Sequence, residues 1–84
     1  MNITQAQLDR AALIEDITDS ELDEADPQSE EYVQLRDKLA ALFMARRRCR
    51  RGLRLEKDID VILAADAEYQ QIEAEFKQRH KTVA

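Results

Sequence analysis

The sequence predicts an all-α protein, and three observations support this prediction. Gly and Pro occur only once each among 84 residues, so the residues that favour tight turns are scarce. The strong helix formers Ala, Leu, Glu, Arg, Gln and Lys dominate the composition. Apolar residues recur at spacings of three and four, which is the period of an amphipathic helix. We therefore expect one small helical domain over residues 1–84, with a long antiparallel helical hairpin and a shorter N-terminal helix.

The first helix is expected over about residues 4–17. Thr4 and Gln7 have the spacing of a capping box, in which each side chain accepts a hydrogen bond from the other residue's backbone N–H. Ile3 precedes the cap and Leu8 follows it, as in a hydrophobic staple. A helix of this length is marginal in water on its own, so we expect it to pack on the rest of the chain.

An acidic connector is expected over residues 18–29, because no basic residue occurs between Arg10 and Arg36. Such a segment is typical of a solvated, mobile linker. Asp26 and Pro27 have the pattern of a helix cap followed by proline in the first helical position, and Ser29 is an alternative cap. The second helix should therefore begin at Pro27 or Ser29.

Two functional interpretations of the connector are weaker than this structural one. A calcium loop would need glycine at its sixth position, where the sequence has Glu24. A row of carboxylates could also imitate the phosphates of a nucleic acid. Only the positions 1, 3, 5 and 12 of the calcium template are matched, by Asp19, Glu21, Asp23 and Glu30.

The second helix is expected over about residues 27–51. Its apolar stripe repeats at intervals of three and four and continues in register into an arginine-rich end. The stripe consists of Tyr32, Leu35, Leu39 and Leu42, followed in register by Arg46, Cys49 and Leu53. Gly52 is the only glycine, and its place after a run of helix formers predicts a left-handed residue that ends the helix. Leu53 would then fold back onto the helix end.

The third helix is expected over about residues 54–80. Because the connection to the second helix is short, the two helices should be antiparallel neighbours. We expect the apolar stripes of this hairpin to form the core or to bind a partner. The predicted stripe residues are Leu35, Leu39, Leu42, Phe43, Ile62, Tyr69, Ile72 and Phe76.

The net charge of −5 conceals an acid–base–acid pattern along the chain. Residues 1–45 sum to −8, residues 46–57 to +6 and residues 58–84 to −3. The basic segment contains the arginine cluster, which consists of Arg46, Arg47, Arg48, Arg50, Arg51 and Arg54. We expect this cluster to form the charged tip of the hairpin.

The arginine cluster has three interpretations. It could contact phosphates of a nucleic acid or of an acidic lipid surface, but an acidic domain with a pI near 4.8 lacks the overall basic charge typical of such proteins. It could bind an acidic protein surface. Alternatively, the acidic first half of the chain could neutralise it internally. We favour protein contact, within the chain or between chains.

The sequence shows no sign of an enzyme, a metal site or a cofactor site. Geometry argues against a catalytic Cys49–His80 pair, because an antiparallel hairpin places these residues near opposite ends. Cys49 falls in the register of the apolar stripe, where cysteine behaves as a small hydrophobic residue. One cysteine and one histidine also cannot complete a zinc shell, and we expect no small-molecule substrate.

The sequence therefore predicts a protein–protein interaction module: an adaptor, a chaperone-like partner or an inhibitor. Its partner would be another protein chain, in a homo-oligomer or a hetero-complex. The alternative is a nucleic-acid-associated regulator that uses the arginine cluster. The lone cysteine fits a reducing, cytoplasmic location. The longest apolar run, residues 40–45, is too short to span a membrane.

Overall fold

A computed structural model describes the backbone of residues 2–83 and the side chains of residues 2–80. It contains α1 (Gln5–Glu24), α2 (Glu30–Arg50) and α3 (Glu56–Val83), and no strand occurs within the described residues. All three helices pack against one another. The prediction of an all-α chain is confirmed, and the hairpin with an N-terminal helix agrees with the structure in outline.

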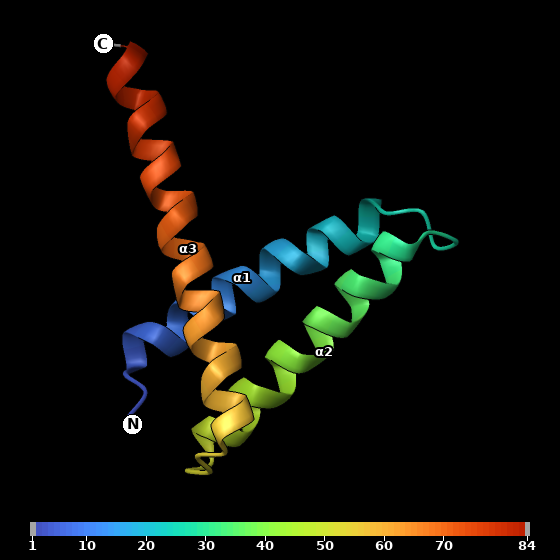
Figure 1. The fold of residues 1–84 in the computed structure, drawn as a ribbon, viewed down its shortest axis with the longest axis vertical. Coiled ribbons are helices and arrows are strands. Elements are labelled where there is room, and N and C mark those ends of the chain that lie inside the picture. Colours follow the sequence, from blue (N-terminus) through green and yellow to red (C-terminus); the bar gives the residue numbers. More distant parts are fainter. Residues whose placement is uncertain (1, 84) are drawn as a thin grey trace.

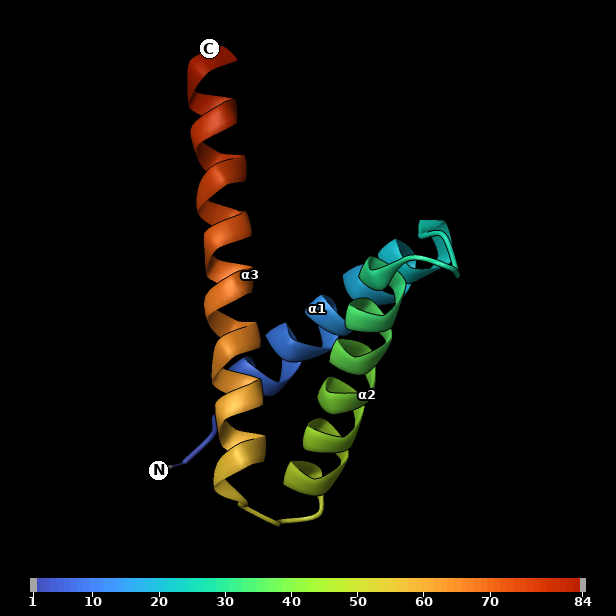
Figure 2. The ribbon, with the colours of Figure 1, turned by 45° about the vertical axis from the view of Figure 1, so that its right-hand side comes forward.

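The three helices form an open, flat arrangement rather than a parallel bundle. In Figure 1, α1 and α2 run beside each other in opposite directions, and α3 crosses α1 near its N-terminal end. The chain measures 45 × 35 × 15 Å along its principal axes. The second half of α3 extends away from the other two helices, as the turned view in Figure 2 also shows.

The N-terminus of α1 forms as its sequence predicts. The backbone N–H of Gln7 donates to Thr4 Oγ1 at 3.2 Å, and the backbone N–H of Thr4 donates to Gln7 Oε1 at 2.9 Å. These two bonds are the expected capping box. Ile3, directly before the cap, is buried in the core. The prediction for this end of the helix is confirmed.

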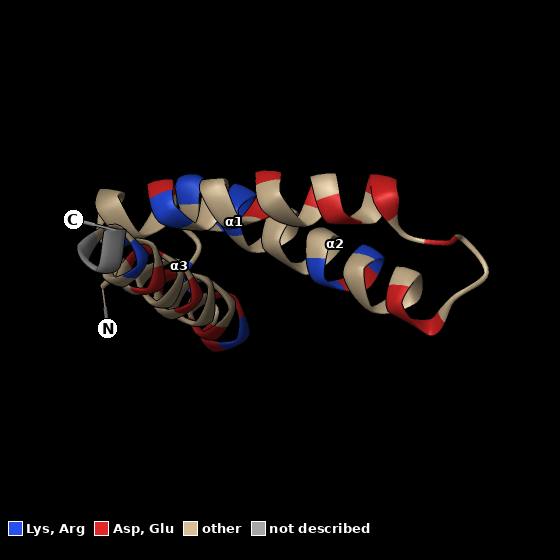
Figure 3. Cartoon of the chain, turned by 90° about the horizontal axis from the view of Figure 1, so that it is seen from above, with Lys and Arg blue, Asp and Glu red and all other residues tan. Residues whose placement is uncertain are grey.

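The C-terminus of α1 differs from the prediction, because the helix continues through residues 18–24 to Glu24. Thr18 is fully buried, and its hydroxyl donates to the carbonyl of Ile14 at 2.7 Å. A residue that is suited to cap a helix is thus satisfied inside one, and burial against the other helices stabilises the extra turns. The connector shrinks to residues 25–29, with acidic residues at the joined ends of α1 and α2 (Figure 3).

Ser29 and not Pro27 precedes the first turn of α2. The backbone N–H of Tyr32 donates to Ser29 Oγ at 3.1 Å, so the alternative cap is the one that forms. The predicted start at residue 27 is therefore too early. Asp26 instead accepts the backbone N–H of Gln28 at 2.9 Å, which holds the connector in a tight turn.

The C-terminus of α2 ends in a Schellman motif around Gly52. The φ angle of Gly52 is +92°, in the left-handed region that favours glycine. The backbone N–H of Leu53 donates to Arg48 at 3.0 Å, and that of Gly52 donates to Cys49 at 3.1 Å. The predicted stop is confirmed. Leu53 folds back onto the helix end through this backbone bond, while the residue stays 50% exposed.

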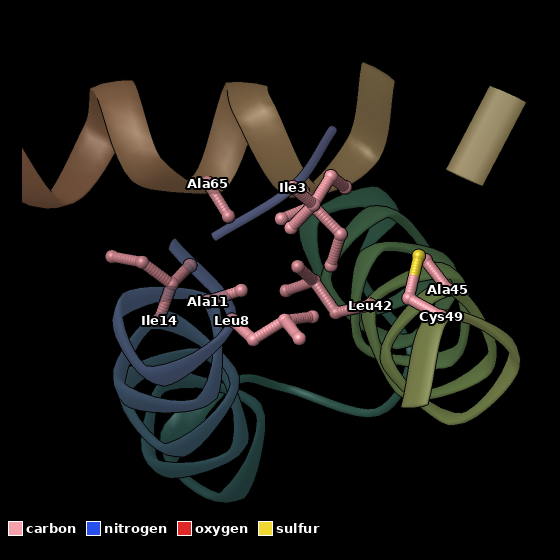
Figure 4. Packing of buried hydrophobic residues seen from close by; sticks show 9 residues of the cluster. Ile3, Leu8, Ala11, Ile14, Leu42, Ala45, Cys49 and Ala65 are labelled. Atoms are coloured by element: carbon pink, nitrogen blue, oxygen red, sulfur yellow. The ribbon is translucent and has the colours of Figure 1, made fainter. Parts of the chain in front are cut away.

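The hydrophobic core is small and lies where the three helices meet (Figure 4). Three of its members are alanines, and this lets the helix backbones approach closely at their contacts. The core consists of Ile3, Leu8, Ala11, Ile14, Leu42, Ala45, Cys49, Ile62 and Ala65. Cys49 is 1% exposed, so its predicted place on the apolar stripe is confirmed.

The predicted stripe residues are divided between the core and the surface. Leu42 and Ile62 are fully buried, and three others are half-buried: Leu35, Leu39 and Tyr69. The remaining three are exposed: Phe43, Ile72 and Phe76. Part of the apolar periodicity of α2 and α3 therefore continues outside the core.

We predict that Ile62→Ala removes most of the stability of the fold. Truncation of a fully buried Ile typically costs about 2–5 kcal/mol, as much as the core of a chain this small contributes in total. Leu53→Ala is the matched control, because half of the Leu53 side chain is already exposed; its change should stay within about 0.5 kcal/mol. Urea unfolding followed by circular dichroism measures both, and similar midpoints for the two variants would contradict this account of the core.

Candidate functional site

The arginine cluster is divided by the fold into inward-facing and outward-facing residues. Arg46 forms an ion pair with Glu15 of α1. Arg48 forms two hydrogen bonds with Asp58 of α3, from Nε at 2.7 Å and from Nη2 at 2.8 Å. The Arg46–Glu15 pair is a neutralisation by the acidic first half of the chain, whereas Arg48 is neutralised by an acid of α3.

Asp58 is the most deeply buried carboxylate of this region, with 2% of the residue exposed. The hydrogen bonds from Arg48 lower its pKa from the ordinary value of 3.8, although burial acts in the opposite direction. The same pairing raises the pKa of Arg48. Because Asp58 lies in the first turn of α3, this bidentate pair fixes the start of α3 against the end of α2.

A further buried carboxylate joins α1 to α3. Asp66 is 7% exposed and forms an ion pair with Arg10. Gln70 Nε2 also donates to it at 3.1 Å. The hydrogen bond from Arg10 is the main reason that the pKa of Asp66 lies below its ordinary value. Each pair of helices is therefore joined by an ion pair beside the core, and the individual partners were not predicted from the sequence.

Arg54 satisfies backbone groups at the end of α2. Its guanidinium donates to the carbonyl of Leu53 at 3.1 Å and also to the carbonyl of Cys49. Leu53 lies beyond the end of α2, and the carbonyl of Cys49 also accepts the backbone N–H of Gly52. Arg54 thus stabilises the tip of the hairpin.

The other three arginines form what we call the basic face, which consists of Arg47, Arg50 and Arg51. All three are exposed, and no ion pair links them to any carboxylate within the described part of the chain. Their spacing of three and four residues places them along one side of α2. Together with Phe43 and Arg46 they line a shallow depression. The basic face is thus available to an external anion.

A separate surface lies on α3 beyond the core. We call residues 69–80 the α3 arm; every residue from 70 to 80 is exposed. The stripe that places Ile62 and Ala65 in the core continues at the same spacing through Tyr69, Ile72 and Phe76. The core-facing side of α3 therefore remains apolar where α1 and α2 no longer cover it.

The exposed end of this stripe has a defined local shape. Phe76 is 56% exposed, and its ring lies against that of His80, with centroids 4.2 Å apart and planes at 48°. Ile72 is 38% exposed. Glu73 and Lys77 border the stripe and form an ion pair at 3.3 Å along the helix. The residues Tyr69, Ile72, Glu73, Phe76 and Lys77 line a shared depression.

The described residues contain neither a candidate metal site nor a candidate membrane-spanning helix. No three His, Cys, Asp or Glu side chains among them are grouped so that they could hold a metal ion. None of the described helices combines the length and the apolar character that a membrane crossing requires. Comparison with known proteins adds nothing to this description, since no protein-family model, no curated protein and no solved structure matches the chain.

We predict that Asp58→Asn destabilises the fold at pH 7 and that this difference shrinks in acid. Because the folded-state pKa of Asp58 is lowered, its ionised form stabilises the fold above the unfolded value of about 3.8. That contribution is lost as the pH falls below 3.8 through the folded-state pKa. Urea midpoints of wild type and variant should therefore converge below pH 3.8.

Asp60→Asn is the control for this measurement, because Asp60 lies on the same helix but is exposed. Its midpoint should follow that of the wild type at every pH. A constant gap between wild type and Asp58→Asn from pH 7 to pH 2.5 would contradict a stabilising ion pair at this position.

Proposed function

We propose that the chain is a protein–protein interaction module that docks through the α3 arm. The single observation behind this proposal is the apolar stripe of α3, which continues at core spacing into a segment that is exposed from residue 70 to residue 80. Proteins that work alone seldom expose contiguous apolar surface of this kind, and larger patches typically mark interaction sites.

The energetics of the α3 arm favour a partner. Full burial of a side chain such as Ile72 or Phe76 contributes about 1.5–3 kcal/mol relative to its exposure. A helical segment of this length is also marginal in water without tertiary contacts. A partner that covers the stripe would gain the burial energy and stabilise the helix of the arm at the same time.

Recognition would follow the helix-in-groove mode, in which residues at spacings of three and four anchor an amphipathic helix. The basic face supplies a second contact for acidic side chains of a partner. An adaptor, a chaperone-like partner or an inhibitor would each use these surfaces. We propose a binding role in the cytoplasm and no catalysis, since the buried carboxylates Asp58 and Asp66 pair with arginines of other helices and the single cysteine is buried.

We predict that a photo-crosslinking residue at position 76, introduced into the chain in its own cells, forms adducts with a protein. The same residue at position 53 is the control, because Leu53 is similarly exposed but lies outside α3 and its apolar stripe. Denaturing gel electrophoresis and mass spectrometry identify adducts that are specific to position 76. Equal labelling at both positions, or none at either, would refute the α3 arm as a docking element.

A nucleic-acid-associated role is the second candidate, and the exposure of the basic face favours it. Arg47, Arg50 and Arg51 lie along one side of α2 without carboxylate partners among the described residues. Three phosphate contacts would give a salt dependence of log K with a slope of at most about −3. The net charge of −5 opposes such binding, so we place this role second.

We predict that duplex DNA does not bind the chain measurably at 150 mM salt. Fluorescence anisotropy at low salt tests the second candidate directly, with the triple variant of Arg47, Arg50 and Arg51 to Ala as the specific comparison. Arg36→Ala is the control, because Arg36 is an exposed arginine near the other end of α2. Binding that is lost in the triple variant and kept in the control would establish the nucleic-acid role.

A further inference from the structure

We propose that the α3 arm binds the α3 arm of a second copy of this chain, in antiparallel orientation. This inference rests on the proposed function, because it assumes that the arm is a docking element and adds what covers it. Three observations support it: the charge order along the arm, the position of the arm relative to the rest of the fold, and the exposure of its charged side chains.

The charges of the arm change sign at Phe76. Glu73 and Glu75 precede it, and no basic residue occurs in residues 69–75. Lys77 and Arg79 follow it, and no acidic residue occurs in residues 77–80. The arm is therefore acidic on one side of its central aromatic residue and basic on the other.

This charge order makes the arm complementary to itself in only one orientation. In an antiparallel pair centred near Phe76, the acidic half of each arm lies against the basic half of the other. At the centre the two Phe76 side chains would meet, and Ile72 of each arm would lie near His80 of the other. A parallel pair would place acid beside acid and base beside base, and like charges across an interface are unfavourable.

The fold also has room for the antiparallel orientation. The other two helices pack on the first half of α3, while the arm projects from them (Figure 2). Two antiparallel arms place the two sets of α1 and α2 at opposite ends of the pair. Two parallel arms would bring both sets to the same end.

The charged side chains beside the stripe can exchange partners at little cost. The side chains of Glu73 and Lys77 are 50% and 73% exposed, and their contact is an ion pair within one helix. Such exposed pairs contribute about 0–1 kcal/mol, so replacing them by contacts between copies is not opposed by a strong bond. Exposed long side chains can also cover the edge of an apolar contact with their methylene groups.

The resulting interface is small, and the association should be reversible. Interfaces below about 1,200 Å² in total are typical of weak, transient encounters. Sedimentation velocity at low salt, over a range of concentrations, should therefore show a monomer–dimer equilibrium of the purified full chain. Low salt matters because exposed charges are screened over a Debye length of about 10 Å at 0.1 M.

Charge reversal tests whether the charges of the two arms meet at the interface. Glu73→Lys with Glu75→Lys makes the arm basic, and Lys77→Glu with Arg79→Glu makes it acidic. We expect each double variant alone to have a dimer dissociation constant raised by at least about tenfold, because like charges then face each other. An equimolar mixture of the two variants should associate at least as strongly as the wild type.

The mixture distinguishes charge repulsion at the interface from loss of the fold. Mixing could restore association in the first case but could not repair a misfolded variant. Circular dichroism of each variant checks that the helices are intact. A wild type that stays monomeric at all concentrations would overturn the inference, as would a mixture that fails to associate. If the crosslinker at position 76 then captures a different protein, the proposed function stands while this inference fails.

Discussion

The fold depends on charges that are paired across the helices beside a small core. Arg10–Asp66 joins α1 to α3, Glu15–Arg46 joins α1 to α2, and Arg48–Asp58 joins α2 to α3. Two of the carboxylates are almost fully buried, so each must keep its partner; loss of one partner would leave an uncompensated charge inside. These three pairs therefore favour the packing in which each buried carboxylate meets its arginine.

The same pairs determine what remains for function. The basic segment of the sequence contains six arginines, and the fold uses three of them for its own contacts: Arg46 and Arg48 pair with acids, and Arg54 donates to carbonyls. Only the basic face remains outside. The charged surface of this protein is therefore smaller than the run of arginines in the sequence suggests, because three of these arginines make contacts within the fold.

Local features of this fold follow from the sequence, and long-range ones do not. The Thr4 capping box and the Gly52 stop were predictable, because each depends on residues within a few positions. The continuation of α1 past residue 17 was not, because it depends on burial of Thr18 by other helices. The ion pairs were missed, although Asp58 and Asp66 share the register of Ile62; a charge on an apolar stripe indicates a buried partner.

The difference in helix length explains why a docking surface arises here at all. α3 has 28 residues and is about 42 Å long, whereas α1 and α2 have 20 and 21 residues and are about 30 Å long. The other two helices pack on the first half of α3, so the arm extends beyond them (Figure 2). A helical arm that is surrounded by solvent on all sides is expected to carry polar residues on every face. Ile72 and Phe76 instead continue the apolar stripe that packs in the core. One copy of the fold leaves these two residues exposed, so a second surface is needed to bury them.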